Sequence, residues 1–429
     1  MRNSLHARHA PHPILLAACA ATIAFSATPP VRAQEPEAAR KGVERTRRST
    51  LAATARGPAF DRVDPAALER LLTAARDAHS DALVVLHDGQ LVGAWHSGGR
   101  SRRIEAMSVT KSIVNLAIGR LVTLGALEPI DVPVSRFYPE WSTGRKARVT
   151  IRHLLNHTSG IESGRTTEEI YVSRDFVRLA LDAEIISEPG SRFFYNNKAV
   201  NLLAGIVEKA TGRKMDDFLR KDLFARLGIT DFRWSRDRAG NPHVMAGLQI
   251  HAADLARLGQ LVLDRGRWQG EQLIAESWFD ESLRPGSPHA ATSGLLWWLI
   301  PADTTAVIDD ARIQQLREAG VDSAFVAAVA RVRGRYESMD SLAAALAGTL
   351  GEDWRSVVNN TLGPLGIPLA RSEYGPVIGY QANGYLGQYL VIFPEKRLVA
   401  VRMVEGSASY NPQTDGFRNF FDLVYALMP

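Results

Sequence analysis

The chain has 429 residues, of which 45% are hydrophobic and 23% are charged, a composition typical of soluble globular proteins. This length can bury a large core, in one big domain or in two interlocked lobes. The formal net charge is +5, and three of the positive charges lie in residues 1–33, which contain no acidic residue. Since no basic stripe interleaved with aromatic residues is present, nucleic acid is not an expected partner.

Residues 1–33 have the pattern of a signal peptide for export. A basic start precedes the apolar run 14–27, which is too short for a stable membrane span, and Val31-Arg32-Ala33 is a small-x-small cleavage site. Cys19, the only cysteine, lies in a sequence that resembles a lipoprotein cleavage box. A soluble periplasmic or secreted protein is favoured over a lipoprotein. The mature chain would then contain no cysteine, which excludes disulfides, thiolate catalysis and cysteine-bound metal.

The next part of the chain predicts a flexible linker followed by regular structure. Residues 34–60 are rich in Ala, Arg, Glu and Pro and lack apolar periodicity, which is typical of a linker. Capping, alternation and turn residues then predict, in order, a helix over 64–78, a β-hairpin with strands 82–86 and 91–95 around His87-Asp88-Gly89, and an apolar helix from Ser108.

The middle of the chain, from about 120 to 290, is predicted to be mostly helical, with amphipathic helices over 200–209 and 252–263. Strand patterns return at 388–393 and 398–403, before a final helix over 416–427. This order predicts an α+β fold, in which the N- and C-terminal segments form an antiparallel sheet flanked by helices, with an inserted helical domain. The expected domains are an α/β sheet domain (61–120 and 371–429) and a helical domain (121–302).

Residues 303–370 are predicted to form a separate helical insertion, with helices over 308–319, 323–333 and 341–350. The insertion lies just before the returning strands. It is interpreted either as a lid over a cleft or as a helical decoration without a part in function.

Lys111 is the only one of the eight lysines that has a serine three positions before it. Residues three apart share a helix face, so its amine is expected beside the Ser108 hydroxyl. The surrounding helix is apolar on nearly every side, and burial would remove the lysine charge near pH 7. Lys111 could then act as the base for Ser108, whose N–H at the helix start would face a substrate oxyanion. The alternative is a solvated lysine on an exposed face.

Two further segments carry groups that suit acyl-transfer chemistry. Tyr195 could relay a proton beside a lysine, and Asn197 could donate to a substrate carbonyl and hold the lysine. The alternative is a packed aromatic residue and a helix cap. The glycine-rich segment 379–388 would let a ligand approach the strand closely, and an N–H there could be a second oxyanion donor; the alternative is an ordinary bulged loop.

Ser108-x-x-Lys111, Tyr195-x-Asn197 and the late glycine-rich strand occur in this order. In these motifs the chain resembles the serine β-lactamase and penicillin-binding superfamily, on the branch of class C β-lactamases, family VIII esterases and 6-aminohexanoate-dimer hydrolases. The segments 154–161, 246–248 and 253–256 are similar to other signatures of that branch. The loop around His157 is expected to be mainly structural.

The resemblance implies acylation of Ser108, with Lys111 as base and Tyr195 as proton shuttle. It also implies a substrate contact for Asn197, a second oxyanion donor at the Ala382 N–H, and a substrate-side place for Gln388, which ends an approximate Gly-x-Gly-Gly-Gln motif. Where the superfamily usually has Lys-Thr-Gly or His-Thr-Gly, this chain has Gly379-Tyr380-Gln381. This loss of a cation favours an esterase or amidase over efficient penicillin or cephalosporin hydrolysis.

The expected function is an exported serine hydrolase that acts on small esters or amides through a covalent acyl-enzyme, without a metal or another cofactor. One alternative is a β-lactamase or D-alanyl-D-alanine carboxypeptidase. Another is a non-catalytic homologue that binds a peptide or glycan. The sequence predicts neither the acyl and leaving groups, nor the deacylation base, nor the oligomeric state.

Overall fold

The computed structural model describes residues 62–428, except 128, 165, 407–409 and 412–413. The expected signal peptide with Cys19 and the expected linker lie outside the described residues, so export stays a prediction. No helix in the described ranges is long and apolar enough to cross a membrane. The described residues form two compact units, one of residues 301–376 and one of the rest of the chain.

The larger unit is organised around a six-stranded sheet with the order β2-β1-β14-β13-β12-β8. Its strands are β1 (Ala82–His87), β2 (Gln90–His96), β8 (Trp298–Pro301), β12 (Val377–Gly384), β13 (Gln388–Phe393) and β14 (Leu398–Met403). β1 pairs antiparallel with both β2 and β14, which joins the two ends of the chain in one sheet. In the β1–β2 turn, Asp88 and Gly89 both have positive φ (49° and 75°), as a type I′ hairpin turn requires.

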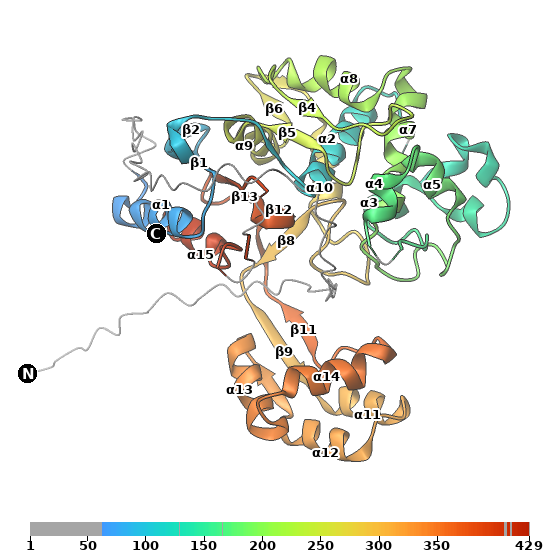
Figure 1. The fold of residues 1–429 in the computed structure, drawn as a ribbon, viewed down its shortest axis with the longest axis vertical. Helices are drawn as coiled ribbons and strands as arrows, with labels where there is room; N and C mark the ends of the chain where they lie inside the picture. Colours follow the sequence, from blue (N-terminus) through green and yellow to red (C-terminus); the bar gives the residue numbers. More distant parts are fainter. Residues whose placement is uncertain (1–61, 128, 165, 407–409, 412–413, 429) are drawn as a thin grey trace, which may run out of the picture. The chain divides into compact units, whose positions relative to one another are not determined.

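Helices cover both faces of this sheet because its strands alternate two sets of buried side chains. On one face, α1 (Pro65–Asp77) lies beside α15 (Phe420–Tyr425), and the Phe420 ring stacks on Tyr389 of β13. On the other face lie α2 (Val109–Thr123) and α9 (Ala252–Leu263). Gly259 of α9 approaches Leu390, the neighbour of Tyr389 along β13. Figure 1 shows α1 in blue and α15 in red together. The predicted α+β class is confirmed.

The chain between α2 and β8 is mostly helical, as expected, and it packs around α2. It also contains short strands. β4 (Arg233–Trp234) and β5 (Leu248–Ile250) form a small sheet with β3 (Ile104–Glu105), which precedes α2, and β6 (Arg267–Trp268) pairs with β7 (Glu271–Gln272). Its helices are α3 (Ile151–Leu155), α4 (Glu168–Val172), α5 (Phe176–Asp182), α6 (Asn197–Val200), α7 (Leu202–Thr211), α8 (Met215–Leu219) and α10 (Glu276–Ser282). Every residue of α2 from Val109 to Leu121 is buried, which explains the apolar pattern of this helix.

The smaller unit contains the predicted insertion 303–370 and has a hydrophobic core of its own. Its helices are α11 (Asp310–Glu318), α12 (Ser323–Arg331), α13 (Met339–Leu350) and α14 (Trp354–Leu362). Three short strands, which the sequence interpretation did not include, form a sheet of order β10-β9-β11: β9 (Thr304–Ile308), β10 (Gly334–Tyr336) and β11 (Arg371–Tyr374). The strands were missed because they have three to five residues each, too few for a clear alternation.

Candidate active site

Ser108 is the N-cap residue of α2 and follows a strained turn. Met107, directly before it, has φ +48°, in the left-handed region that non-glycine residues rarely adopt. The Ser108 N–H has no hydrogen-bond acceptor among the described residues, and the start of α2 carries partial positive charge. Negative charge that develops on an oxygen beside Ser108 would therefore be stabilised.

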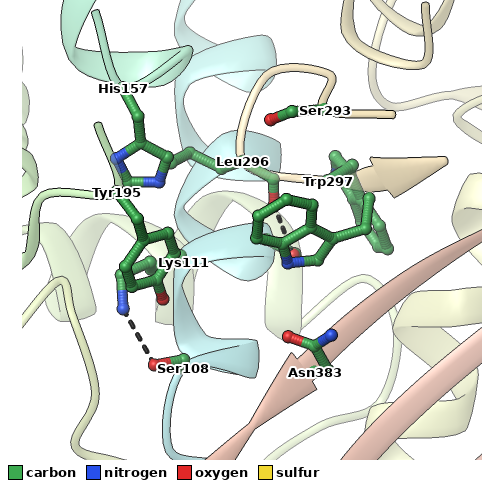
Figure 2. A pocket seen from close by; sticks show the side chains of 10 residues that line it. Ser108, Lys111, His157, Tyr195, Ser293, Leu296, Trp297 and Asn383 are labelled. Atoms are coloured by element: carbon green, nitrogen blue, oxygen red, sulfur yellow. Dashed lines mark hydrogen bonds between the residues drawn. The ribbon is translucent and has the colours of Figure 1, made fainter. Parts of the chain in front are cut away.

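Lys111 lies one helical turn further along α2, with only 3% of its surface exposed. Its Nζ is 2.9 Å from Ser108 Oγ and 2.7 Å from the carbonyl oxygen of Met245, as Figure 2 shows for the first pair. Asn201 Oδ1 accepts hydrogen bonds from the N–H groups of Val244 and Met245, which fixes that carbonyl. Burial lowers the pKa of Lys111 well below its ordinary value. A neutral amine is thus held where it can accept the Ser108 proton.

Tyr195 completes a group of three with Ser108 and Lys111. Its ring centre lies 5.0 Å from Lys111 Nζ. Burial raises the pKa of Tyr195 to about 12, against a smaller opposing effect of the nearby Ser108 side chain. At neutral pH the side chain is therefore a phenol. Of the two groups that could take the Ser108 proton, Lys111 is the one in its basic form.

Four rings, which we call the aromatic cluster, hold Tyr195 in place. The ring centroids are 4.6 Å apart for His157 and Tyr195, 5.9 Å for His157 and Phe193, 6.2 Å for Phe193 and Trp298, and 6.1 Å for Tyr195 and Trp298. Each such contact contributes roughly 0.5–1.5 kcal/mol beyond area burial. Since every ring touches two others, the Tyr195 ring has little freedom to turn away from Ser108.

His157 lines the pocket, yet its environment makes it a poor acid or base. Its Nδ1 accepts a hydrogen bond from the Asn196 N–H at 3.2 Å, which ties the Tyr195 segment to the loop after α3. Burial, with a smaller effect of the nearby Lys111, lowers the pKa of His157 to about 3. The imidazole is therefore uncharged at neutral pH, and it supports the segment that carries Tyr195.

The opposite wall of the pocket is a loop anchored to α2. Ser112 Oγ donates to the Leu296 carbonyl at 2.6 Å, one turn beyond Ser108. Asn115 donates to the Leu295 carbonyl at 2.8 Å and accepts from the Trp297 indole N–H at 3.2 Å. Two polar residues of α2 thus hold the loop in place, and its residues Leu296 and Trp297 line the pocket (Figure 2).

The end of β12 lies beside Ser108. Asn383 lines the pocket, and a Cβ placed on Gly384 would lie 3.0 Å from Ser108 N. Ala382 is buried in the hydrophobic core, with 1% of its surface exposed. Burial of its side chain leaves the role of its backbone N–H open, so Ala382 as an oxyanion donor stays a prediction.

The turn after Gly384 is held by a buried arginine. Leu386 and Gly387 both have positive φ (69° and 77°), and their carbonyls accept hydrogen bonds from Arg402 Nη1 at 3.4 and 2.9 Å. Arg402 is fully buried and its hydrogen bonds go to carbonyl and hydroxyl oxygens. Burial lowers the pKa of Arg402 to about 10, so it stays charged at neutral pH and fixes this turn beside the nucleophile.

Gln388, expected on the substrate side, is a structural residue, and that prediction was wrong. Its side chain is fully buried. Its Nε2 donates to the Val404 carbonyl, and its Oε1 accepts from the Val404 N–H at 2.9 Å. Both ends of the amide are engaged with the backbone that follows β14, so the side chain extends the sheet and leaves no group for a substrate.

Asn197 is the first residue of α6 and does not belong to the residues that line the pocket. Its Oδ1 is buried and has no hydrogen-bond partner in the described part of the chain. The helix cap is Asn196, whose Oδ1 accepts from the Ala199 N–H at 2.8 Å. A substrate contact for Asn197 stays a prediction, whereas its alternative interpretation as the cap is wrong.

Several pocket residues were not predicted, and they come from two segments far apart in the sequence. They are Ser293, Leu296, Trp297, Trp298 and Asn383. The adjacent tryptophans just before a strand were the one available signal, since large aromatic residues at a strand start often line binding sites. The described ranges contain no group of three His, Cys, Asp or Glu residues that could hold a metal ion.

The fold and the Ser108–Lys111–Tyr195 geometry place the chain in the β-lactamase and transpeptidase class. A solved family VIII carboxylesterase is similar with a TM-score of 0.56 and 13% identity, covering 87% of this chain and 98% of that one. The D-alanine carboxypeptidase AmpC from Burkholderia cenocepacia is similar with a TM-score of 0.52 and 15% identity, covering 84% and 97%. At these identities the likeness concerns the fold alone.

The sequence model of the Beta-lactamase family matches residues 66–421, so the chain belongs to that family and the predicted superfamily is confirmed. It is 34% identical to esterase EstB of Burkholderia gladioli over 162 residues, which are 32% of this chain and 41% of EstB. It is 24% identical to the 6-aminohexanoate-dimer hydrolase of Paenarthrobacter ureafaciens over 279 residues, 57% of this chain and 69% of that enzyme. The match thus spans less than half of EstB.

Proposed function

We propose that the protein is a serine hydrolase that forms a covalent acyl-enzyme on Ser108 with small esters or amides. The observation that carries the proposal is the buried Lys111 amine 2.9 Å from Ser108 Oγ, where burial lowers the pKa of the amine and favours its basic form. The relatives named as an esterase and a 6-aminohexanoate-dimer hydrolase support it. The pocket beside Ser108 is lined by residues of α2, of the His157 and Tyr195 segments, of the loop before β8 and of the end of β12.

Acylation uses the three polar groups in sequence. Lys111 Nζ takes the proton of Ser108 as Oγ attacks the substrate carbonyl carbon, and the carbonyl oxygen becomes an oxyanion. The proton then passes from the Lys111 ammonium, with Tyr195 as relay, to the leaving alkoxide or amine nitrogen. The carbon–heteroatom bond breaks, the alcohol or amine departs, and a water molecule later hydrolyses the acyl-serine.

The oxyanion would be held by the Ser108 N–H together with the strand end. The end of β12 comes close to this N–H at Gly384, so the second donor is expected there, at the Ala382 N–H or at an N–H of its neighbours Asn383 and Gly384. Such donors are worth about 10²- to 10³-fold in turnover each in well-studied hydrolases.

We expect Gly384→Ala to reduce kcat/KM for a 4-nitrophenyl ester by about 100-fold, because a small displacement near the reacting atoms has this effect. The added methyl would lie 2.9 Å from the Ala106 carbonyl oxygen and 3.0 Å from Ser108 N, so the nucleophile or the strand must move. The control is Gly348→Ala in α13, where nothing lies within 4 Å. Unchanged turnover in Gly384→Ala would contradict this placement of the strand.

The proposal is tested by acyl-enzyme detection. Purified protein is mixed with a panel of short-chain 4-nitrophenyl esters, anilides and one chromogenic cephalosporin, quenched in acid, digested and analysed by mass spectrometry. We expect the acyl mass on the peptide that contains Ser108, and at least a roughly 10³-fold loss of ester turnover in Ser108→Ala. Equal turnover by Ser108→Ala would overturn the proposal.

Ser101 supplies a matched control for that experiment. Its Oγ lies 2.8 Å from His251 Nδ1, and His251 Nε2 lies 2.8 Å from Asp231, so it is the competing serine with a hydrogen-bonded base. Ser101 is exposed and lies outside the pocket. We expect Ser101→Ala to retain turnover and acylation of Ser108.

The two alternative functions make different predictions in the same panel. A β-lactamase or D-alanyl-D-alanine carboxypeptidase would turn over the cephalosporin or release D-alanine. Where such an enzyme usually has a cation on the strand, this chain has Gly379-Tyr380-Gln381. A non-catalytic binding homologue would form no acyl-enzyme. The contact of serine, lysine and tyrosine side chains supports catalysis over binding alone.

A further inference from the structure

The side chains that line the pocket around Ser108 include few that can carry a charge. Among the described residues that line it, Lys111, His157 and Tyr195 are the only side chains that titrate in or near the neutral and alkaline range. Burial lowers the pKa values of Lys111 and His157 and raises that of Tyr195, which disfavours the charged form of each. The other walls are serine, leucine, asparagine and tryptophan side chains, and neither an acidic side chain nor an arginine contributes.

The walls are also flat and apolar. The aromatic cluster forms one side, with Tyr195 and Trp298 nearly parallel at an interplanar angle of 21°. Trp297, beside Trp298 in the sequence, also lines the pocket. The Trp297 N–H is already bound to Asn115 Oδ1, so this residue offers its ring and not its polar atom. Such walls favour apolar or aromatic groups.

The cationic side chains that are close to Tyr195 in the sequence interact with groups outside the pocket. Lys198, which follows Asn197, has its Nζ 2.6 Å from Glu162 and 2.8 Å from Glu169. The Arg192 guanidinium lies over the Phe194 ring, 5.7 Å from its centroid. The attraction for negative charge that the site does offer is the Ser108 N–H at the start of α2, where the oxyanion forms.

We infer that the site accepts uncharged acyl groups, apolar or aromatic, and discriminates against acyl groups that carry a carboxylate. This inference rests on the proposed function and names its substrate class. A carboxylate that enters the pocket loses its hydration and finds no cation in return, and an unpaired buried charge is strongly disfavoured. A neutral acyl chain of the same length loses little hydration free energy when it enters the pocket, and it gains contact with the aromatic walls.

The experiment compares two esters that differ in a single group. 4-Nitrophenyl hexanoate and mono-4-nitrophenyl adipate share the leaving group and chain length, and the terminal methyl of the first is a carboxylate in the second. Their kcat/KM values are divided by their rates of hydrolysis by hydroxide, to remove intrinsic reactivity. We expect the corrected value to be about 100-fold higher for the hexanoate, since each factor of ten corresponds to about 1.4 kcal/mol.

Substitution at Asn383 tests the cause. Asn383 lines the pocket from the end of β12, and Figure 2 shows its side chain directed into it. Asn383→Lys adds a cation, and Asn383→Met adds similar length without charge. We expect the adipate-to-hexanoate ratio to be roughly tenfold higher in the lysine variant than in the methionine variant, as for a charge pair at a partly exposed site.

The outcomes separate the two proposals. Equal corrected rates for the two esters in the wild-type protein would overturn this inference and leave the proposed function standing. An equal ratio in the lysine and methionine variants would overturn it as well. A protein that hydrolyses neither ester, and is acylated by neither, would overturn the proposed function and this inference with it.

Discussion

Replacement of Lys111 by methionine is expected to lower kcat/KM by about 10³- to 10⁴-fold, because the variant keeps the Ser108 hydroxyl but loses the base beside it. The same change is expected to alter stability in a pH-dependent way. In the folded protein burial lowers the pKa of Lys111, whereas the unfolded chain binds a proton on this amine below its ordinary pKa. Folding of the wild-type protein therefore releases a proton in the neutral and mildly alkaline range.

The sign follows from this proton release. Because the unfolded state binds more protons, the wild-type protein loses stability as pH falls, by about 1.4 kcal/mol per pH unit for one group, while Lys111→Met does not. The free energy of unfolding is measured with urea at pH 9 and at pH 7.5. The value for the variant minus the value for the wild type should be about 2 kcal/mol higher at pH 7.5 than at pH 9. Lys221→Met, at an exposed position, is the control and should show no such change. If the difference in free energy of unfolding between the variant and the wild type is the same at both pH values, Lys111 is charged in the folded protein.

Replacement of Tyr195 by phenylalanine is expected to lower kcat/KM by about 10²- to 10⁴-fold, the usual contribution of a proton relay. The ring contacts of the aromatic cluster remain, so the free energy of unfolding should change by less than about 1 kcal/mol. Tyr389→Phe is the matched control: it removes a hydroxyl that donates to the Gly416 carbonyl at 2.9 Å, away from the pocket. We expect that variant to keep its turnover.

The pH profile of the wild-type protein separates the two possible bases. With Lys111 as base, kcat/KM should rise with pH through the lowered pKa of the lysine and then remain level. With a Tyr195 phenolate as base, it should continue to rise towards pH 12, since burial raises the pKa of Tyr195 to about 12. A profile that still climbs between pH 9 and 10.5, measured on a 4-nitrophenyl ester after correction for hydroxide, would assign the proton to Tyr195 and contradict the proposed sequence of steps.

The helices and strands that the sequence predicted well bury either one face or all of their side chains. The strands at 388–393 and 398–403 and the helix at 252–263 have the predicted bounds, because their apolar residues follow one clear period. The hairpin turn followed from Asp88-Gly89, which tolerates positive φ. The strands of the smaller unit and the short pairs near β3 and β6 were missed, since two to five residues carry almost no period.

The same division holds for the site. Ser108 and Lys111 are neighbours on one helix, so local spacing was enough to bring them together, and the buried α2 supplied the shift in the lysine pKa. The approach of Gly384 to Ser108 and the hydrogen bonds of Gln388 to Val404 join segments far apart in the sequence or depend on the strand register, so local spacing did not predict them.

The sequence by itself determined the family, the α+β class and the pair of residues that starts the proposed chemistry, because these depend on local pattern and short spacing. The tertiary structure decided which groups surround that pair: the Met245 carbonyl that holds the lysine, the aromatic cluster and the Trp297 loop. Each of these groups is more than 40 residues from Lys111 along the chain, and its approach depends on how the chain packs around α2. Long-range packing is a property of the whole core, and no local pattern encodes it.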